Sequence, residues 1–258
     1  MTDILFEVKN GVAIITLNRP EKFNAITGPM ALQLQSILDE CAADQNARTV
    51  YLTGNGRAFC AGQDLSEMSG DKAPGFDRIL AEHYNPIVSR IRNMEKPVVC
   101  AVNGVAAGAG ANIAICCDIV VAAASASFIQ AFSKVGLIPD SGGTFNLPRL
   151  VGFQKATALM MLGDKLSAAD AEKYGMLYKV FADEVFAAES MKIALVLAAM
   201  PTKALAYTKQ ALNASLHNSF EAQLRVEDKL QFAAANTYDY NEGVAAFLEK
   251  RAPVFKGE

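Results

Sequence analysis

Two glycine-rich turns contain the residue types best suited to chemistry in this chain. They are Ala58-Phe-Cys-Ala-Gly-Gln-Asp-Leu65 and Asn103-Gly-Val-Ala-Ala-Gly-Ala-Gly-Ala-Asn112. Each follows a predicted strand and opens a predicted helix, where free backbone N–H groups present partial positive charge to an oxyanion. Spacing alone favours a simpler interpretation, tight packing of strand on helix, because neither turn has the full glycine pattern or the lysine of a nucleotide-binding loop. Both turns are candidate sites for a developing negative charge.

A third turn, Pro139-Asp-Ser-Gly-Gly-Thr144, adds a carboxylate, that of Asp140. From the residues alone it could equally cap the helix predicted to follow, because Asp is favoured in turns and at helix starts. If Phe132 and Ile138 surround the carboxylate, we expect desolvation to raise its pKa and make it a better base toward a weak carbon acid.

These turns must be held by a layered α/β core. Residues 4–9 and 12–17 alternate in polarity around Asn10-Gly11, which predicts a β-hairpin with a type I′ turn. A helix is predicted over residues 27–44, and the alternation of strands and helices that follows implies right-handed crossovers. Further strands are predicted at residues 49–53, 58–60, 98–102, 118–123 and 176–182, with a long helix ending near Met94 and others starting near Gly110, Ser141 and Ser167.

The last third of the chain is predicted to be helical. Helical patterns cover residues 184–199, 201–216, 219–236 and 239–250 and are joined by few loop residues. We therefore expect an α/β core over residues 1–199 and a helical region over residues 200–258.

Composition limits the classes of partner. The chain has 258 residues, of which 52% are hydrophobic, so a large core and buried subunit interfaces are both possible. A net charge of −3 provides no strongly basic surface for nucleic acid. The uncharged stretch 98–117 is long enough for a membrane helix, but its three glycines and two asparagines predict a buried strand, turn and helix instead. We expect neither nucleic acid nor a membrane as a partner.

The cysteines indicate the compartment. There are five, with no C-x-x-C spacing, and there are two histidines, so no zinc site is expected. The N-terminal residues lack the basic and apolar regions of a signal peptide. The sequence predicts buried free thiols in a reducing compartment, the cytoplasm.

Several phrases occur in a fixed order along nearly the whole chain. They are Leu17-Asn-Arg-Pro20 with Asn24-Ala25, the two glycine-rich turns, the Pro139 turn and Glu242-Gly-Val-Ala-Ala-Phe-Leu-Glu-Lys-Arg251. They resemble successive signatures of the crotonase superfamily, which contains the enoyl-CoA hydratases and isomerases. The resemblance implies a crotonase-like α/β core of repeated ββα units, a C-terminal α-helical trimerisation region, and a homotrimer or dimer of trimers. It implies an acyl-CoA thioester as substrate and no cofactor, because CoA is part of the substrate.

The resemblance also implies an oxyanion hole that polarises the thioester carbonyl. By position, its donors would be the backbone N–H groups of Gln63 and Ala109. Residues expected around CoA and the acyl group are Lys22, Ala25, Ala61, Asp64, Leu65, Ser66, Asn112 and Phe132, together with Phe247 and Lys250, which resemble residues that reach CoA from a neighbouring subunit or the C-terminal region. Simpler roles are open for three polar residues: a structural Asn112, a solvated Lys250 and a solvated His83.

Asp140 is the expected catalytic residue. The positions of the two glutamates of the family's hydratases are occupied here by Asn112 and Phe132, neither of which can act as a base. Asp140 stands at a third position, which carries the catalytic acid of several isomerases of the family. The resemblance thus implies isomerisation, in which one positioned base moves a proton, rather than hydration.

Within the family, residues 105–111 and 131–140 resemble the branch that converts ring-1,2-epoxyphenylacetyl-CoA to an oxepin thioester and shifts 3-enoyl double bonds to the 2-position. Three alternatives are open: a general fatty enoyl-CoA isomerase or hydratase, an aryl-CoA dehalogenase, and a non-catalytic acyl-CoA-binding or RNA-binding relative. The dehalogenase is disfavoured because the chain has no tryptophan. We expect the acyl pocket to be lined partly by residues 66–83.

Overall fold

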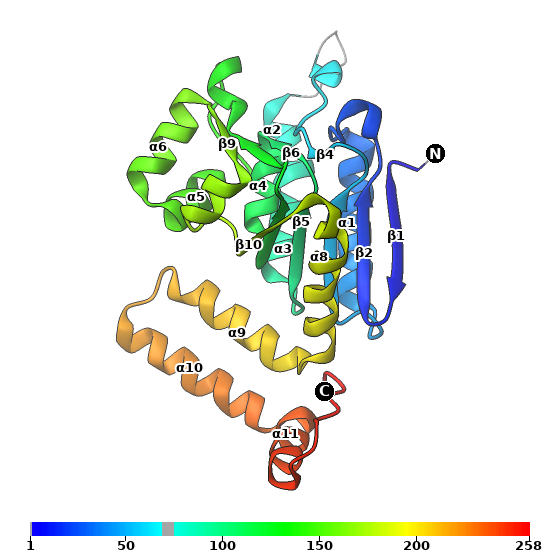
Figure 1. Cartoon of the computed structure of the whole chain (residues 1–258). Coiled ribbons are helices and arrows are strands. Elements are labelled where there is room, and N and C mark those ends of the chain that lie inside the picture. The colour runs from blue at the N-terminus through cyan, green and yellow to red at the C-terminus, as the bar shows by residue number, and fades with distance from the viewer. Residues whose placement is uncertain (1, 69–74) are drawn as a thin grey trace.

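A computed structural model describes residues 2–68 and 75–258, and its main layer is a six-stranded sheet (Figure 1). The strand order is β1-β2-β3-β5-β7-β10, with β1 and β2 antiparallel and the other pairs parallel. The strands are β1 (Ile4–Lys9), β2 (Val12–Leu17), β3 (Thr49–Gly54), β5 (Val98–Val102), β7 (Ile119–Ala123) and β10 (Lys179–Phe181). The hairpin is confirmed, since Asn10 and Gly11 both have positive φ, as a type I′ turn requires.

A second sheet has the order β4-β6-β8-β9 and is built from strands of three residues. They are β4 (Ala58–Cys60), β6 (Val105–Ala107), β8 (Ser127–Ile129) and β9 (Lys165–Ser167). The chain repeats one pattern: a strand in the large sheet, a strand in the small sheet, then a helix. Glycine makes the turn between the two strands possible at Gly54 and Gly104, where a Cβ would lie 2.5 and 2.2 Å from backbone oxygens.

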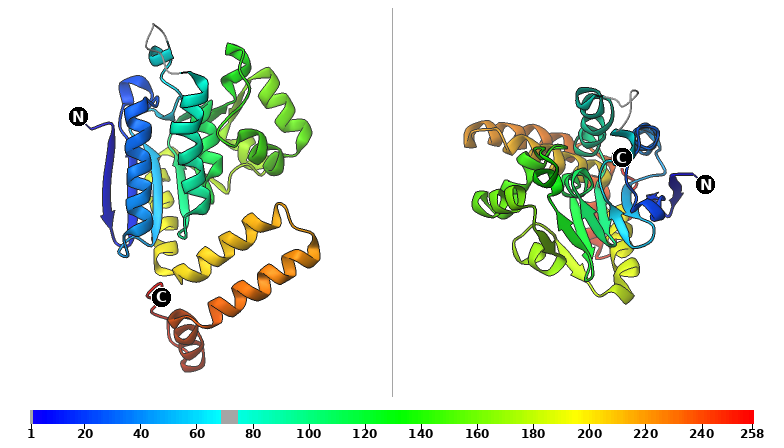
Figure 2. Two further views of the ribbon diagram at one scale, coloured as in Figure 1. Left: turned by 180° about the vertical axis from the view of Figure 1, so that it is seen from behind. Right: turned by 90° about the horizontal axis from the view of Figure 1, so that it is seen from above.

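Helices cover both faces of the large sheet. Helices α1 (Gly28–Ala43) and α3 (Asn85–Asn93) lie on one face and α8 (Asp183–Ala199) lies on the other (Figure 2). The remaining helical segments are η1 (Pro20–Lys22), η2 (Leu65–Met68), α2 (Phe76–Arg78), the π-helical η3 (Ile79–Tyr84), α4 (Ala109–Cys116), η4 (Ala131–Val135), α5 (Gly143–Val151), α6 (Phe153–Leu162) and α7 (Ala168–Lys173).

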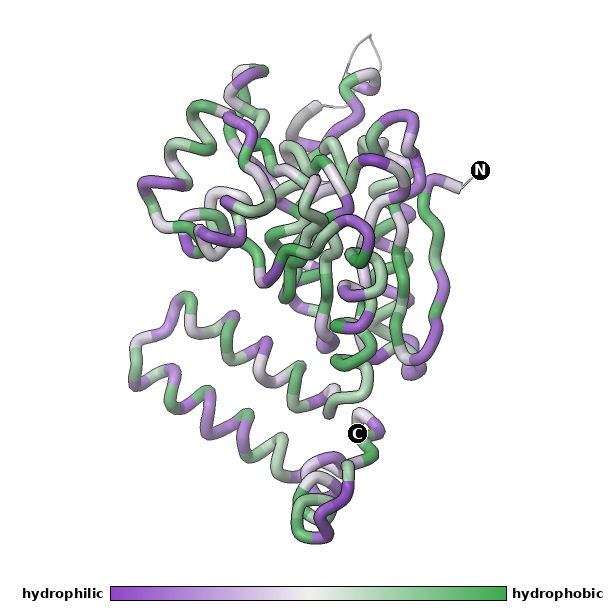
Figure 3. Tube along the Cα trace, in the orientation of Figure 1, coloured by the Kyte–Doolittle hydropathy of each residue, from purple (hydrophilic) through white to green (hydrophobic). Residues whose placement is uncertain are grey.

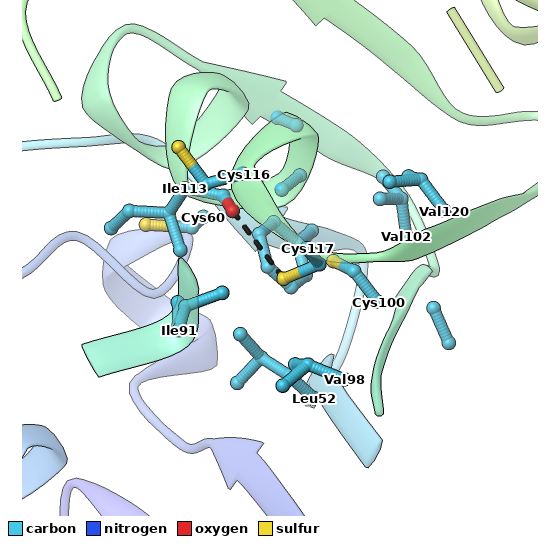
Figure 4. Packing of buried hydrophobic residues seen from close by; sticks show 14 of the residues in the cluster. Leu52, Cys60, Ile91, Val98, Cys100, Val102, Ile113, Cys116, Cys117 and Val120 are labelled. Carbon is cyan, nitrogen blue, oxygen red and sulfur yellow. Dashed lines mark hydrogen bonds between the residues drawn. The ribbon is translucent and has the colours of Figure 1, made fainter. Parts of the chain in front are cut away.

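The hydrophobic core lies between these layers. Figure 4 shows Leu52 and Val98 of the large sheet close to Ile91 of α3, with three cysteines around the C-terminal end of α4. All five cysteines are buried and free, and Cys117 donates a weak hydrogen bond to the carbonyl oxygen of Ile113. Burial raises the pKa of Cys41, Cys60 and Cys116 to about 12, so these thiols stay protonated.

Helices α9 (Thr202–Ser215), α10 (Phe220–Ala235) and α11 (Tyr238–Glu249) lie to one side of the α/β core. Lys209 of α9 anchors them: its Nζ donates to Asp118 Oδ2 at 2.8 Å and to the carbonyl oxygen of Ile91 at 2.7 Å. None of the residues of α10 is buried, and hydrophobic residues are scattered along it among hydrophilic ones (Figure 3). Helices α9, α10 and α11, here called the C-terminal arm, therefore expose apolar side chains.

No single helix in the described part of the chain is long and apolar enough to cross a membrane. Helices α8 and α9 together have the length and apolar composition of a membrane span, but they meet at an angle of 104°.

Most predicted elements are confirmed, including all four C-terminal helices and β4, while the other three strands of the small sheet were missed. β6 lies inside the second glycine-rich turn, and β8 and β9 follow residue 126, where few strands were expected. Strands of three residues are too short to show a periodicity. The predicted strand 176–182 is shorter than expected, because β10 covers Lys179–Phe181, and α6 was also missed.

Candidate functional site

The two glycine-rich turns contact each other. The first begins with β4 and the second contains β6, and these strands are paired in parallel, so the residues that follow each strand leave the same edge of the small sheet. A Cβ added to Gly62 would lie 3.0 Å from the carbonyl oxygen of Ala107 and 3.3 Å from the backbone nitrogen of Ala109. Gly62 also has φ +89°, a conformation that side chains rarely adopt. Glycine at this position therefore lets the turns meet.

The backbone around Gln63 directs its N–H group away from the chain beside it. The Ile26 N–H donates to the carbonyl oxygen of Gly62 at 2.7 Å, and the Asp64 N–H donates to the carbonyl oxygen of Ile26 at 2.9 Å. Since the residues on either side bond to Ile26, the N–H of Gln63 points to the opposite side.

Ala109 supplies a second free N–H group. It is the first residue of α4, so its N–H has no acceptor within the helix. Within residues 2–68 and 75–258, neither the Gln63 N–H nor the Ala109 N–H donates to a protein acceptor. Two unpaired donors beside a cavity are suited to an oxygen that gains negative charge.

The cavity in front of these donors is mostly apolar. It is lined by Ala61, Gly62, Gln63, Leu65, Met68, Ile79, Tyr84, Gly108, Ala109, Ala131, Phe132, Val135, Leu137 and Asp140. The two predicted donors, Asp140, Phe132, Ala61 and Leu65 are thus brought together. Of the acyl-pocket segment 66–83, Met68 and Ile79 line the cavity, and residues 69–74 lie outside the described residues.

Asp140 is half-buried at the cavity wall, and burial raises the pKa of its carboxyl above the ordinary value of an aspartate. The hydroxyl of Ser141 donates to Asp140 Oδ1 at 2.8 Å and acts in the opposite direction on this pKa. Asp140 does not cap α5, whose N-cap is Gly142 with no side-chain bond. The expectation that Ile138 lines the pocket is wrong, because Ile138 is 81% exposed and is not among the residues that line the cavity.

Asn112 lies behind the Asp140 loop and does not line the cavity. It is fully buried; its Nδ2 donates to the carbonyl oxygen of Asp140 at 2.9 Å, and its Oδ1 accepts from Gln130 Nε2 at 2.8 Å. A Cβ on Gly143 would lie 2.3 Å from Asn112 Nδ2, so a glycine is needed there for the loop to approach. The structural role left open for Asn112 is the one its contacts support, since they fix the backbone that presents Asp140.

Replacing Ser141 with glycine is expected to shift the acidic limb of the kcat/KM profile to higher pH. The change removes the hydroxyl that lowers the pKa of Asp140, and glycine readily adopts the positive φ of 50° found at Ser141. A pH profile of kcat/KM measures the limb. Ser133→Ala, at an exposed position on η4, is the matched control, and an acidic limb at the wild-type pH in Ser141→Gly would contradict the prediction.

The other residues expected around CoA, which are Lys22, Ala25, Asp64 and Ser66, are not among the residues that line the cavity. The Ala61 N–H donates to the carbonyl oxygen of Phe23, which joins the first turn to the segment that contains Lys22 and Ala25. Lys22 is exposed and Ala25 is buried. Asp64 is bound by Ser66 Oγ at 2.6 Å and by Arg19 Nη2 at 2.9 Å, and these bonds, with that of Ser66 contributing most, lower the pKa of its carboxyl. Its role within the chain is therefore to join the turn to residue 19.

Phe247 and Lys250 are not brought to the cavity. They belong to the end of α11 and its C-cap, at the opposite end of the molecule from β4 and β6 (Figure 1). Phe247 is 82% exposed. His83 does not line the cavity either; it lies against Gly28, which a Cβ would bring within 3.1 Å of the imidazole.

Sequence reasoning missed Tyr84, whose hydroxyl donates to Gln63 Oε1 at 2.9 Å inside the cavity. It also missed Val135 and Leu137 as lining residues, whereas Met68 and Ile79 fall in the expected segment 66–83. The apolar residues around the Asp140 turn were a usable signal for the last two, whereas nothing in the sequence separates Tyr84 from its neighbour His83.

Comparison with known proteins shows which family the chain belongs to. A family model described as enoyl-CoA hydratase/isomerase matches residues 7–258. The chain is 47% identical to the 1,2-epoxyphenylacetyl-CoA isomerase of Escherichia coli (strain K12), with all of both chains covered. It is 36% identical to the trans-2-decenoyl-[acyl-carrier-protein] isomerase of Streptococcus mutans, covering 99% of this chain and 98% of the other.

A solved structure agrees in fold and dimensions. The enoyl-CoA hydratase from Bacillus anthracis superimposes with a TM-score of 0.94 at 31% identity, with all of both chains covered. Match length, identity and fold all indicate the same family. The chain belongs to the enoyl-CoA hydratase/isomerase family.

Proposed function

We propose that this enzyme is an acyl-CoA isomerase that uses Asp140 to move a proton next to a CoA thioester. One observation carries the proposal: among the described residues that line the cavity, Asp140 is the one carboxylate. By the resemblance to the family, Asn112 and Phe132 stand at the positions where its hydratases have glutamates. Hydration needs one group to activate water and another to handle the carbon-bound proton. Isomerisation needs a single base.

In this mechanism the thioester oxygen accepts hydrogen bonds from the Gln63 and Ala109 N–H groups. These donors stabilise the negative charge of the enolate that forms when a proton leaves the carbon next to the carbonyl. For a 3-enoyl thioester, Asp140 accepts the proton from C2 and the dienolate then takes it back at C4, which leaves the double bond at C2. The raised pKa of Asp140 suits both steps, because it strengthens the base and retains the proton for return.

The substrate we propose is ring-1,2-epoxyphenylacetyl-CoA, converted to the oxepin thioester, with 3-enoyl-CoA as a second substrate. The apolar lining of the cavity and the name of the Escherichia coli relative support this choice. A general fatty enoyl-CoA isomerase is the second candidate, favoured by the likeness to the decenoyl isomerase. No separate cofactor enters either reaction, and the five buried thiols support a reducing, cytoplasmic location.

Incubation of the enzyme with each thioester, followed by absorbance and mass spectrometry, tests the function. We expect isomers of unchanged mass from both the ring epoxide and a 3-enoyl-CoA. A faster reaction on 2-enoyl-CoA, with a product heavier by one water, would overturn the isomerase proposal.

We further propose that the chain assembles as a trimer or a dimer of trimers through its C-terminal arm. Phe220 and Phe232 of α10 are 73% and 74% exposed, which is unusual for large apolar side chains on a free surface. In an assembly, Phe247 and Lys250 could contact the CoA of a neighbouring subunit, although they lie far from the cavity of their own chain.

Light scattering is expected to give three or six times the mass of one chain. Phe232→Asp should lower that mass, because it places a charge on the face that we assign to the interface. A wild-type mass of one chain would contradict the proposed assembly.

A further inference from the structure

Tyr84 is the buried polar side chain of the cavity wall that the mechanism above leaves without a role. It is 1% exposed, and its hydroxyl donates to Gln63 Oε1 at 2.9 Å. Burial is the largest cause that raises the pKa of this phenol well above its usual value, so the hydroxyl keeps its proton and remains a donor. Gln63 is the residue whose backbone N–H faces the thioester oxygen.

A π-helical turn brings Tyr84 to this wall. Ile79 and Tyr84 both line the cavity although they are five residues apart, and in an α-helix that spacing would separate them by about 140° around the axis. In η3 the Asn85 N–H donates to the carbonyl oxygen of Leu80, an i→i+5 bond that widens the turn. The widened turn places both residues on one face of the helix. Such turns are frequent at functional sites.

The other end of the Gln63 side chain is held as well. Its Nε2 donates to Glu67 Oε2 at 3.2 Å, and the same oxygen accepts the Gly28 N–H at the start of α1, at 2.9 Å. The side-chain oxygen of Gln63 is thus bound by Tyr84 of η3, and its side-chain nitrogen is bound by Glu67 of η2. Glu67 also binds the start of α1. Free rotation of the side chain is blocked on both sides.

We propose that Tyr84 is a positioning residue that, by holding the Gln63 side chain, fixes the direction of the Gln63 N–H toward the thioester oxygen. The inference rests on the proposed function in assigning that N–H to the oxyanion. A donor must lie within a few tenths of an ångström of its productive position, and groups whose rotamers are locked by neighbours achieve this. The main-chain bonds to Ile26 set the general orientation of the peptide group between Gly62 and Gln63. The two side-chain bonds of Gln63, to Tyr84 and Glu67, form a clamp that restricts its remaining motion.

The test measures how strongly the bound carbonyl is polarised. The probe is 4-dimethylaminocinnamoyl-CoA, a 2-enoyl thioester whose absorbance moves to longer wavelength as its carbonyl is polarised, and whose aryl ring leaves it without a proton at C4. Tyr84→Phe is expected to reduce the red shift of the bound probe. It should also lower kcat for 3-enoyl-CoA roughly 10-fold and leave KM within about twofold, because the loss falls on a charge that develops in the transition state.

The matched control is Tyr51→Phe. Tyr51 is also a buried tyrosine whose hydroxyl is hydrogen-bonded to Ser190 Oγ at 2.8 Å, but it joins β3 to α8 and does not line the cavity. This variant should keep the wild-type red shift and kcat. Gln63→Leu should reduce the red shift as Tyr84→Phe does, and the double variant should lose little more, because both changes break the same clamp.

Three results would overturn the proposal: an unchanged red shift in Tyr84→Phe, an equal loss in Tyr51→Phe, or no red shift in the wild type. The absorbance measurement needs binding and not turnover. A chain that shows the predicted shifts but isomerises no thioester would therefore count against the proposed function and leave the role of Tyr84 standing.

Discussion

Replacing Asp140 with asparagine is expected to lower kcat for 3-enoyl-CoA isomerisation by roughly 10²- to 10⁴-fold, the contribution of a positioned general base. Asparagine has nearly the same shape and its oxygen can still accept the Ser141 hydroxyl bond, so the loop and the cavity should persist. The affinity for the thioester should change little, because the N–H donors at Gln63 and Ala109 are untouched. Steady-state kinetics with a binding measurement separates the two effects.

The same substitution is not expected to destabilise the enzyme. Burial raises the pKa of Asp140 in the folded chain above its unfolded value, so the folded chain binds more protons in the interval between the two. Stability is therefore lost as pH rises through that interval, and at neutral pH the charged carboxylate costs the fold free energy. Asp140→Asn removes this cost, so the melting temperature at neutral pH should equal or exceed that of the wild type. A large loss of kcat with a lowered melting temperature would indicate a structural role instead.

Replacing Lys209 with methionine is expected to lower the free energy of unfolding by about 3–5 kcal/mol. The side chains of Lys209 and Asp118 are 8% and 19% exposed, and removing the ammonium leaves a buried carboxylate without its counter-charge. The Val98 N–H would still donate to Asp118 Oδ2, but one neutral donor does not replace the cation. Chemical denaturation at one fixed protein concentration measures the change, since subunit association contributes to stability.

Two controls separate burial from charge. Lys192→Met breaks an exposed pair with Glu189 and is expected to cost at most about 1 kcal/mol. Adding Asp118→Asn to Lys209→Met should recover part of the loss, because no unpaired buried charge then remains. If Lys209→Met and Lys192→Met cost the same, the assignment of Lys209 as the anchor of the C-terminal arm would be wrong.

The fold was predictable where the elements are long. The hairpin at Asn10-Gly11 and the C-terminal helices have enough residues to show a period of 2 or 3.6, and the structure confirms them. Of the small sheet only the strand at 58–60 was predicted, because the three residues at 105–107 or 127–129 carry no periodicity. Their strand geometry comes from pairing with segments far away in the chain.

The site, like the fold, was only partly predictable from the sequence. The two glycine-rich turns and the Asp140 turn could be found from the sequence because glycines and turn residues mark where the backbone leaves a strand, while Gln63 and Ala109 were assigned as donors by the resemblance to the family. The direction of the Asn112 side chain depends on Gln130 and on the Asp140 loop, neither of which is near it in sequence. Tyr84 reaches the cavity through a π-helical turn, which a helical pattern with a constant period does not reveal.

The most direct test of Asp140 as the proton carrier is hydrogen exchange into a 3-enoyl-CoA in D₂O, followed by mass spectrometry of the recovered thioester in wild type and Asp140→Asn. Wild type should introduce deuterium next to the carbonyl and at C4 as the double bond moves, because the proton on Asp140 can exchange with solvent before it returns. Asp140→Asn should bind the thioester and introduce almost no deuterium. Exchange at the wild-type rate in Asp140→Asn would contradict the account, because another group would then carry the proton.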